Sequence, residues 1–186
     1  IDEKQLARIC EIENVTGIKE SVMDRTVVRR HMKALPEDAI VFSGSTFLLR
    51  PVMEMGGHGV ICPVPCMIPE TCAGLFRNCA DGKNSAAVKE EKKVFRLAPL
   101  FTDVLASTTA LRQLIRASAF SGLPMKWSGP PHARVKEAMR LLGHPISARV
   151  KAPLPPLSGE DARLVKKTLR RAGLLDDKQR GEDNSE

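Results

Sequence analysis

The stretch Val15-Thr16-Gly17-Ile18-Lys19 decides the fold, because this short β-branched run is typical of a strand and ends on a lysine. Two further short apolar runs follow it, at residues 39–42 and 59–64. Strands that are almost continuously apolar are typical of a parallel sheet whose faces are covered. The three runs therefore predict three parallel strands.

Segments with helical spacing of apolar residues alternate with these runs, at residues 2–12, 25–35, 45–55 and 68–80. Asp24 and Ser45 are suited to cap the second and third of these helices. Pro36 ends the second helix, and the Gly56-Gly57 pair ends the third. The alternation of strands and helices predicts an α/β protein.

No strand is predicted after Gly82, where the chain becomes helical. Helices are predicted at residues 84–98, 101–120 and 132–142, and a last helix runs from its N-cap Ser158 to Gly173. The chain is thus expected to divide into three parts, which are βα units at 1–82, a helical segment at 83–175 and a disordered polar tail at 176–186.

Three parallel strands are too few to form a protected sheet, because both edges stay open. A (β/α)8 barrel needs eight such units in roughly 250 residues. The sequence therefore predicts the last three βα units of a TIM barrel followed by a helical extension. We expect the front half of the barrel to be absent from this chain.

The composition excludes several classes of protein. Apolar residues make up 42% of the 186 residues, which is enough for a core. No apolar run reaches the roughly 18 residues of a membrane-spanning helix, so no membrane association is expected. Aromatic residues make up 4% and Tyr is absent, which argues against a base-stacking platform for nucleic acid.

The cysteines favour reduced thiols and a cytoplasmic location, because their number, five, is odd and the chain is too long for a small stapled fold. They are Cys10, Cys62, Cys66, Cys72 and Cys79. The spacing from Cys62 to Cys79 is C-x3-C-x5-C-x6-C and contains no C-x2-C pair. Small core residues are therefore favoured over a metal site, and no metal is expected.

The formal net charge of +7 is concentrated in one block, residues 126–171, which holds 11 basic and 3 acidic side chains. Such a block can attract nucleic acid or another anionic partner. The alternative is a solvated basic face on amphipathic helices. We favour that alternative, because a charge excess alone specifies no groove or partner, and nucleic-acid binding is not expected.

Lys19 is the candidate for chemistry, because barrel enzymes keep catalytic residues at the carboxyl ends of their strands. Behind Val15 and Ile18 the lysine is expected to be partly desolvated, which disfavours its charged form. A neutral amine can attack a carbonyl group and form an imine. The alternative is an ordinary exposed lysine at a strand end.

Glycines punctuate the next two strand regions. The run Ser43-Gly44-Ser45 follows a strand and opens a helix, so its amides can face a carboxylate, although turn geometry alone also explains Gly44. The run Gly56-Gly57-His58-Gly59 precedes a strand, so it is no dinucleotide-binding fingerprint. His58 is expected to be a turn residue rather than a base.

Four stretches resemble the dihydrodipicolinate synthase/N-acetylneuraminate lyase family. They are V-T-G-I-K-E-S, I-V-F-S-G-S, M-G-G-H-G-V-I and the final P-L-x-x-x-D-A-x-x-V-K-K-T-L-R-R-A-G-L-L, and P-H-A-R-V-K-E-A-M-R-L-L-G resembles a later family segment. The resemblance implies a Schiff base between Lys19 and a pyruvate-type 2-oxo acid. It places Gly44 and Ile61 in the pyruvate pocket, and it implies a homotetramer and no cofactor.

The chain departs from the family pattern at several points. Val22-Met23-Asp24 stands where the family usually has a small residue and glycine before the acidic residue, and Cys62 stands where Ser or another small residue is common. The G-T-T-G-E loop and the catalytic tyrosine of the family belong to the first five strands, and this chain contains no Tyr.

The sequence therefore predicts a class I Schiff-base lyase or aldolase that acts on pyruvate or a related 2-oxo acid together with an aldehyde or sugar-acid co-substrate. A tyrosine from the missing half would relay protons, so this chain alone is expected to be inactive. The alternative is a non-catalytic remnant or an oligomerisation module of the same family.

Overall fold

The computed structural model describes residues 1–102, 113 and 131–176. Their contacts divide the chain into two compact units, which we treat separately. Among the described residues, the first unit holds 1–95 and 113, and the second holds 96–102 and 131–176. The first unit thus extends beyond the boundary that the sequence predicts at residue 82. Most of the helix predicted at 101–120, including Leu105, Leu111, Leu114 and Ile115, lies outside the described residues, as do residues 121–130 and nearly all of the tail.

The first unit is built on three parallel strands in the order β1-β2-β3, as predicted. The strands are β1 (Gly17–Glu20), β2 (Ile40–Ser43) and β3 (Gly59–Val60). β3 is shorter than the predicted run 59–64, because Pro63 and Pro65 have no N–H for a ladder and the chain turns into the short 3-10 helix η2 (Val64–Cys66).

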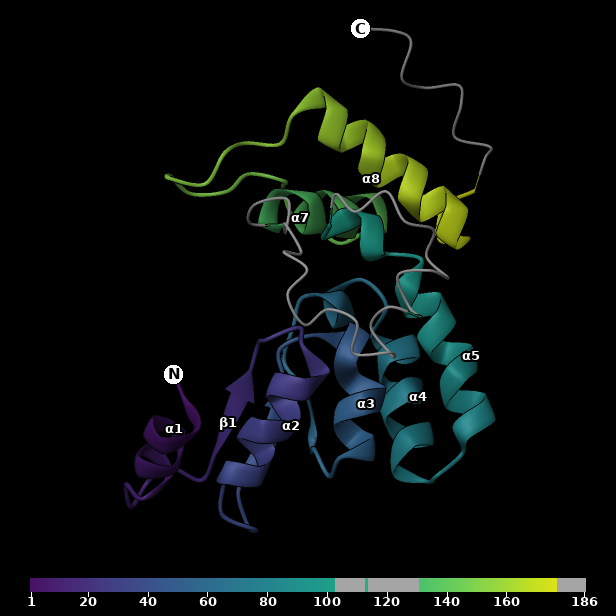
Figure 1. The fold of residues 1–186 in the computed structure, drawn as a ribbon. Helices are drawn as coiled ribbons and strands as arrows, with labels where there is room; N and C mark the ends of the chain where they lie inside the picture. Colours follow the sequence, from purple (N-terminus) through teal and green to yellow (C-terminus); the bar gives the residue numbers. More distant parts are fainter. Residues whose placement is uncertain (103–112, 114–130, 177–186) are drawn as a thin grey trace, which may run out of the picture. The chain divides into compact units, whose positions relative to one another are not determined.

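Helices join and follow the strands in the predicted rhythm (Figure 1). They are α1 (Glu3–Cys10), α2 (Arg25–Ala34), η1 (Thr46–Leu48), α3 (Leu49–Glu54), α4 (Pro69–Ala80) and α5 (Asn84–Phe95). Both predicted N-caps are confirmed, since the side chain of Asp24 accepts from the amides of Thr26 and Val27, and that of Ser45 from the amide of Phe47.

Among the described residues, the two faces of the sheet differ in how far they are covered. Side chains alternate between the faces of a strand, so Val41 and Ser43, which are both buried, lie on the face opposite Ile40 and Phe42. Ile40 is 39% exposed and Ile61, just past β3, is 51% exposed. These exposed residues differ from the fully covered sheet that apolar strands predict, and they are what an incomplete barrel requires.

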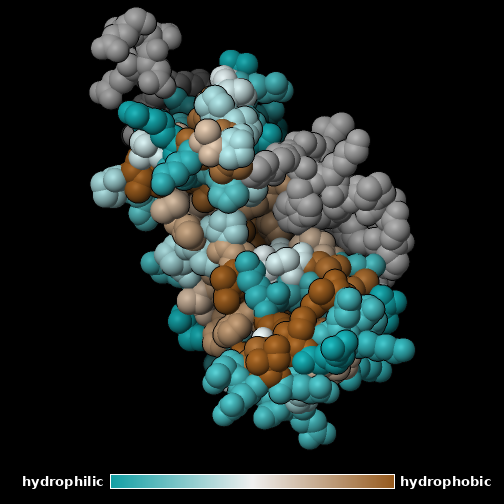
Figure 2. All heavy atoms as spheres, turned by 90° about the vertical axis from the view of Figure 1, so that its left-hand side faces the viewer, coloured by the Kyte–Doolittle hydropathy of each residue, from teal (hydrophilic) through white to brown (hydrophobic). Residues whose placement is uncertain are grey.

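Further apolar side chains are exposed beside β1. Ile1, Ile9 and Ile12 line a surface hollow of about 460 Å³ together with Gln5 and Arg8. Figure 2, which views the molecule from the side of α1 and β1, shows apolar side chains gathered on the first unit.

A buried ion pair joins α3 to α5. Arg50 and Glu91 are 5% and 2% exposed, and Nε of Arg50 donates to Oε1 of Glu91 at 2.9 Å. Arg50 also pairs with Glu54 on its own helix. The rings of Phe47 and Phe95, which are close in sequence to this ion pair, pack with their centroids 5.2 Å apart. These contacts join α5 to η1 and α3 of the first unit, and α5 also packs against α4.

The second unit packs α7 (His132–Leu141) against α8 (Gly159–Ala172), and η3 (Ala98–Leu100) also contacts α8. Ser158 caps α8, and Gly173 ends it at a φ of 75°, as predicted. Nε of Arg134 donates to Asp161 at 2.7 Å. Partial burial raises the pKa of Asp161, but hydrogen bonds from Ser158 and Arg134 outweigh it and hold the pKa below its usual value.

The sequence predicts that the five basic residues of α8 are solvated, and this is confirmed for three of them. Arg163, Lys167 and Arg171 are exposed at intervals of four residues, whereas Lys166 and Arg170 are half-buried. Within the described ranges, no helix is both long and apolar enough to cross a membrane.

Replacing Glu91 with Gln is expected to destabilise the first unit by about 3 kcal/mol, because the buried guanidinium of Arg50 loses one of its two carboxylates. Urea denaturation of the chain measures this loss. Glu70→Gln, at an exposed position in α4, is the control and is expected to leave stability within about 0.5 kcal/mol of the original value. Equal stability of both variants would show that the buried pair contributes nothing.

Candidate functional site

The three predicted site residues lie at one edge of the sheet. Lys19 is opposite Phe42, and Phe42 is opposite Gly59. Gly44 and Ile61 stand two residues further along their strands than Phe42 and Gly59, so alternation returns them to the face of Lys19. The structure thus brings Lys19, Gly44 and Ile61 to the same face at the carboxyl ends of parallel strands.

Lys19 is exposed, and the expected desolvation behind Val15 and Ile18 is not found. The reason is alternation along β1, which turns the side chain of Ile18 towards one face and that of Lys19 towards the other. The side chain of Lys19 lies on the more exposed face of the sheet. A lysine in this position is accessible to a carbonyl compound.

Gly44 sits where β1 and β2 end side by side. Its amide donates to the carbonyl of Glu20 at 2.6 Å. A Cβ on Gly44 would lie 2.3 Å from Oγ and 2.7 Å from Cα of Ser21, closer than real contacts allow. A residue without a side chain is therefore required beside the turn that follows Lys19.

The amides near Gly44 have partners within the chain, which corrects the expectation that they face a carboxylate. The amide of Gly44 bonds to Glu20, and that of Ser45 lies 3.2 Å from its acceptor, Oγ of Ser43. Ser43 is buried, and its hydroxyl donates to the carbonyl of Ser45 at 2.9 Å. The loop is thus held by its own hydrogen bonds.

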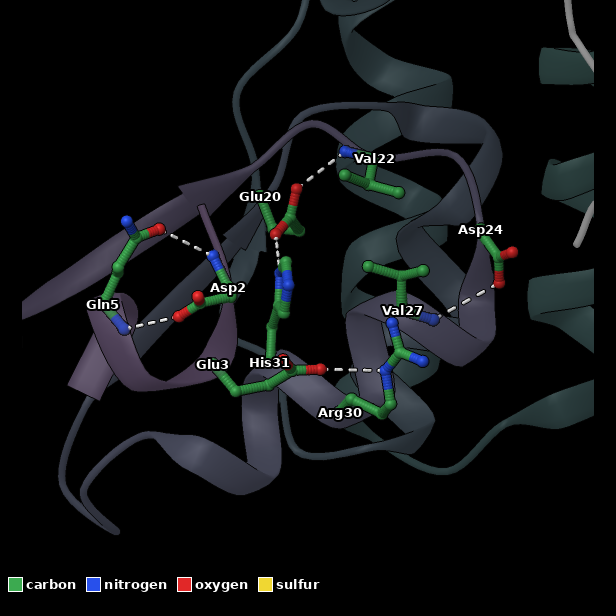
Figure 3. Close-up of polar contacts among 9 residues, drawn as sticks. All are labelled: Asp2, Glu3, Gln5, Glu20, Val22, Asp24, Val27, Arg30 and His31. Carbon is green, nitrogen blue, oxygen red and sulfur yellow. Dashed lines mark hydrogen bonds and ion pairs between the residues drawn. The ribbon is translucent and has the colours of Figure 1, made fainter. Parts of the chain in front are cut away.

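A buried polar pair anchors the end of β1 from the covered side (Figure 3). Oε2 of Glu20 contacts Nδ1 of His31 on α2, and Oε1 of Glu20 accepts from the amide of Val22 at 2.7 Å. His31 is 5% exposed. Together with the bond from Gly44, these contacts fix Glu20, and with it the strand end that carries Lys19.

The sequence alone does not predict this pair, although it carries one signal of it. His31 follows Val28 by three residues on α2, so both belong to the buried side of that helix. A histidine on the apolar side of a helix needs a polar partner. Glu20 is eleven residues away in the chain, and no local pattern joins the two.

Ile61 follows β3 and is bonded to β2, since its amide donates to the carbonyl of Ser43 at 2.9 Å. The next residue, Cys62, places its sulfur 2.8 Å from Oγ1 of Thr46. The loops that follow β2 and β3 are therefore connected through both backbone and side chains.

His58 belongs to the ladder rather than to the site. Its Nδ1 accepts from the amide of Val41 at 3.1 Å, so the ring takes the place of a backbone acceptor at the start of β2. The expected turn lies at Met55 and Gly56, just before His58, and a role of His58 other than that of a base stays a prediction. Within the part of the chain that the structure describes, no group of three or more His, Cys, Asp or Glu residues is arranged to hold a metal ion.

The model of the family described as "Dihydrodipicolinate synthetase family" matches residues 1–132. Curated relatives include 4-hydroxy-tetrahydrodipicolinate synthases from Archaeoglobus fulgidus, 28% identical over 90% of this chain, and from Acetivibrio thermocellus, 27% identical over 94%. The aligned parts cover 49% and 50% of those relatives, so the chain spans about half of their length.

Solved structures with the same fold include YagE, a prophage protein of the dihydrodipicolinic acid synthase family from E. coli K12 in complex with pyruvate. Its TM-score is 0.71 at 18% identity, over 93% of this chain and 51% of that one. The dihydrodipicolinate synthase from Thermotoga maritima gives 0.67 at 25% identity, over 93% of this chain and 51% of that one. The fold is thus that of part of a TIM barrel followed by helices.

Replacing Gly44 with Ala is expected to destabilise the first unit by about 2 kcal/mol, because the added methyl group collides with Ser21 and forces the two strand ends apart. Faster hydrogen exchange at the amide of residue 44 would report the broken bond to Glu20. Gly74→Ala is the matched control, since its new Cβ would lie 3.7 Å from the nearest atom, and it is expected to be neutral or stabilising. Unchanged exchange at residue 44 would contradict the steric argument.

Proposed function

The chain belongs to the dihydrodipicolinate synthetase family, and from that premise we propose that it carries the imine-forming lysine of a Schiff-base lyase or aldolase acting on pyruvate or a related 2-oxo acid. The observation that carries the proposal is the position of Lys19, Gly44 and Ile61 on one face at the carboxyl ends of three parallel strands. This is the end at which barrel enzymes hold their substrates.

The reaction begins when the neutral amine of Lys19 attacks the ketone carbon of the 2-oxo acid. Loss of water from the resulting carbinolamine gives an imine, which withdraws electrons from the neighbouring carbon. A base takes a proton from that carbon and gives an enamine, which attacks an aldehyde and forms a carbon–carbon bond. The aldehyde oxygen takes up a proton, and water then hydrolyses the new imine and frees the amine of Lys19. Cleavage of a longer 2-oxo acid follows the same steps in reverse. An aldehyde or sugar acid is therefore the proposed co-substrate class.

Gly44 and Ile61 shape the space beside the amine. The close contact between Gly44 and Ser21 keeps the end of β2 within reach of the turn after Lys19. Ile61 presents an apolar side chain on the same face, suited to the methyl group of pyruvate. Glu20 and His31 act from the other face, and their role is to hold the strand end in place.

The open face needs a cover before this chemistry becomes efficient. Lys19 is exposed, so water reaches the imine and can hydrolyse it. The chain contains no Tyr, so a tyrosine that relays protons must come from outside it. We propose that the complete site uses a further polypeptide segment, which covers the apolar residues Ile40 and Ile61 and supplies this group. A homo-oligomeric assembly is part of the same proposal.

A non-catalytic remnant is the second candidate, and the exposure of Lys19 favours it. Such a protein would keep the fold and its contacts with other subunits but would form no imine. Trapping of the imine separates the two functions.

Treatment with pyruvate and borohydride is expected to add one carboxyethyl group to Lys19, because borohydride reduces the imine to a stable secondary amine. Peptide mass spectrometry locates the adduct. Lys19→Ala is expected to abolish the adduct because it removes the amine. Lys19→Arg is expected to abolish it as well, because a guanidinium group stays protonated. Lys33→Ala, which removes an exposed lysine of α2, is the control and should retain the adduct. An equal yield from Lys19→Ala would refute the assignment.

Activity is expected only after complementation. The chain alone should show no pyruvate-dependent aldol activity, whereas addition of the first half of the Thermotoga maritima relative should restore measurable turnover. Ile61→Asp should block the gain, because a carboxylate there repels the 2-oxo acid and any apolar cover. Turnover by the chain alone would contradict the proposal.

A further inference from the structure

A surface hollow of about 550 Å³ lies at the amino-terminal ends of β2 and β3, opposite the end of the sheet that holds Lys19. Its walls come from the second half of α2, the loop that follows it, the start of β2, and the turn between α3 and β3. Small-molecule sites in proteins have volumes in this range. The lysine chemistry makes no use of this hollow.

Apolar side chains form much of its lining. Val41 is 3% exposed, whereas Met32, Leu35, Ala39 and Met55 are half-buried. The half-buried side chains present apolar surface that the described part of the chain leaves uncovered. Removal of such surface from water favours a ligand that carries an apolar chain.

Two cations line the same hollow from α2. Arg29 and Lys33 are both exposed, and they are four residues apart, so their Cβ atoms are about 6 Å apart on one side of the helix. Like charges at this spacing repel each other. Among the described residues, neither side chain forms an ion pair. An anion bound between them relieves the repulsion.

Two features oppose an anion, and both are weaker than the pair of cations. Glu37, in the loop after α2, also lines the hollow, but it is exposed and pairs with neither cation. The dipole of α2 places partial negative charge at the end of this helix, which by itself accounts for Lys33. That charge acts over the last turn, and Arg29 lies one turn earlier.

His58 supplies a further donor in the lining. Its Nδ1 accepts from the amide of Val41 at 3.1 Å. A ring nitrogen that accepts a hydrogen bond carries no proton, so the hydrogen of the ring is on Nε2. This nitrogen can donate to a carboxylate oxygen, which adds to the preference of the hollow for an acceptor.

We propose that this hollow is a binding site for a small organic anion with an apolar chain, of the class of alkyl carboxylates. The carboxylate lies between Arg29 and Lys33, and the alkyl chain packs on Met32, Leu35 and Met55. The site is separate from the face of Lys19, so ligand binding holds whether or not this lysine forms an imine.

The test is to titrate the full chain with sodium octanoate and to follow the amide resonances by NMR. Chemical shifts are expected to change at residues 29–41 and 55–58. Octanol, which lacks the charge, and acetate, which lacks the chain, are each expected to bind at least about fivefold more weakly. Equal binding of octanol, or shifts confined to other parts of the chain, would overturn the proposal.

Substitutions then test the two cations. Arg29→Gln and Lys33→Gln are each expected to weaken octanoate binding about fivefold, because each removes one charge beside the carboxylate. Arg30→Gln is the matched control, since Arg30 is exposed on the same helix but pairs with Glu3 at 2.9 Å, and it should change the affinity by less than about twofold. Equal effects of Arg29→Gln and Arg30→Gln would reduce the effect to net charge and contradict the site.

Two further variants separate this site from its alternatives. Glu37→Gln should strengthen octanoate binding, because it removes the carboxylate that repels the ligand, and weaker binding would contradict an anion in the hollow. The hollow beside α1 also combines a cation, Arg8, with apolar side chains. Arg8→Gln should leave octanoate binding unchanged, and loss of binding in this variant but not in Arg29→Gln would refute the assignment.

Discussion

The close approach of β1 and β2 is the constraint on which the rest of the first unit depends. Two glycines permit it, one at each end of the ladder. A Cβ on Gly17 would lie 1.9 Å from the carbonyl oxygen of Ile40, and one on Gly44 would lie 2.3 Å from Oγ of Ser21. Between them the strands pair in register from Gly17 to Glu20. The same pairing sets Lys19 beside Phe42, two residues before Gly44. Phe42 in turn lies beside Gly59, two residues before Ile61.

Because side chains alternate along these short strands, the two faces of the sheet have different roles. The face of Val41 and Ser43 is buried and carries stability, while the face of Lys19 and Ile61 is open and carries the proposed chemistry. Glu20 joins the two faces, because its backbone bonds to Gly44 and its side chain reaches His31. Pairs of this kind let the packed side of a sheet hold a residue on the other side in position.

Local patterns predicted most of the fold, since caps such as Asp24 and Ser158 and the spacing of apolar residues depend on near neighbours in the chain. The environment of Lys19 and the partners of the Gly44 amide were predicted incorrectly, because both depend on which strand face is covered and which turn lies opposite. The pair of Glu20 and His31 was missed for the same reason. The family resemblance placed the site residues in sequence, but only the pairing of the strands puts them on one face.

The buried pair of Arg50 and Glu91 also sets the register of α5. Apolar contacts are non-directional, so they resist a slide of α5 by one helical turn less specifically than a hydrogen-bonded ion pair does. Such a slide moves Glu91 by about 5.4 Å, which is longer than any hydrogen bond to Arg50 and leaves two charges buried without each other. The ion pair therefore favours one alignment of α5 relative to α3 over alignments that apolar contacts alone would distinguish less sharply.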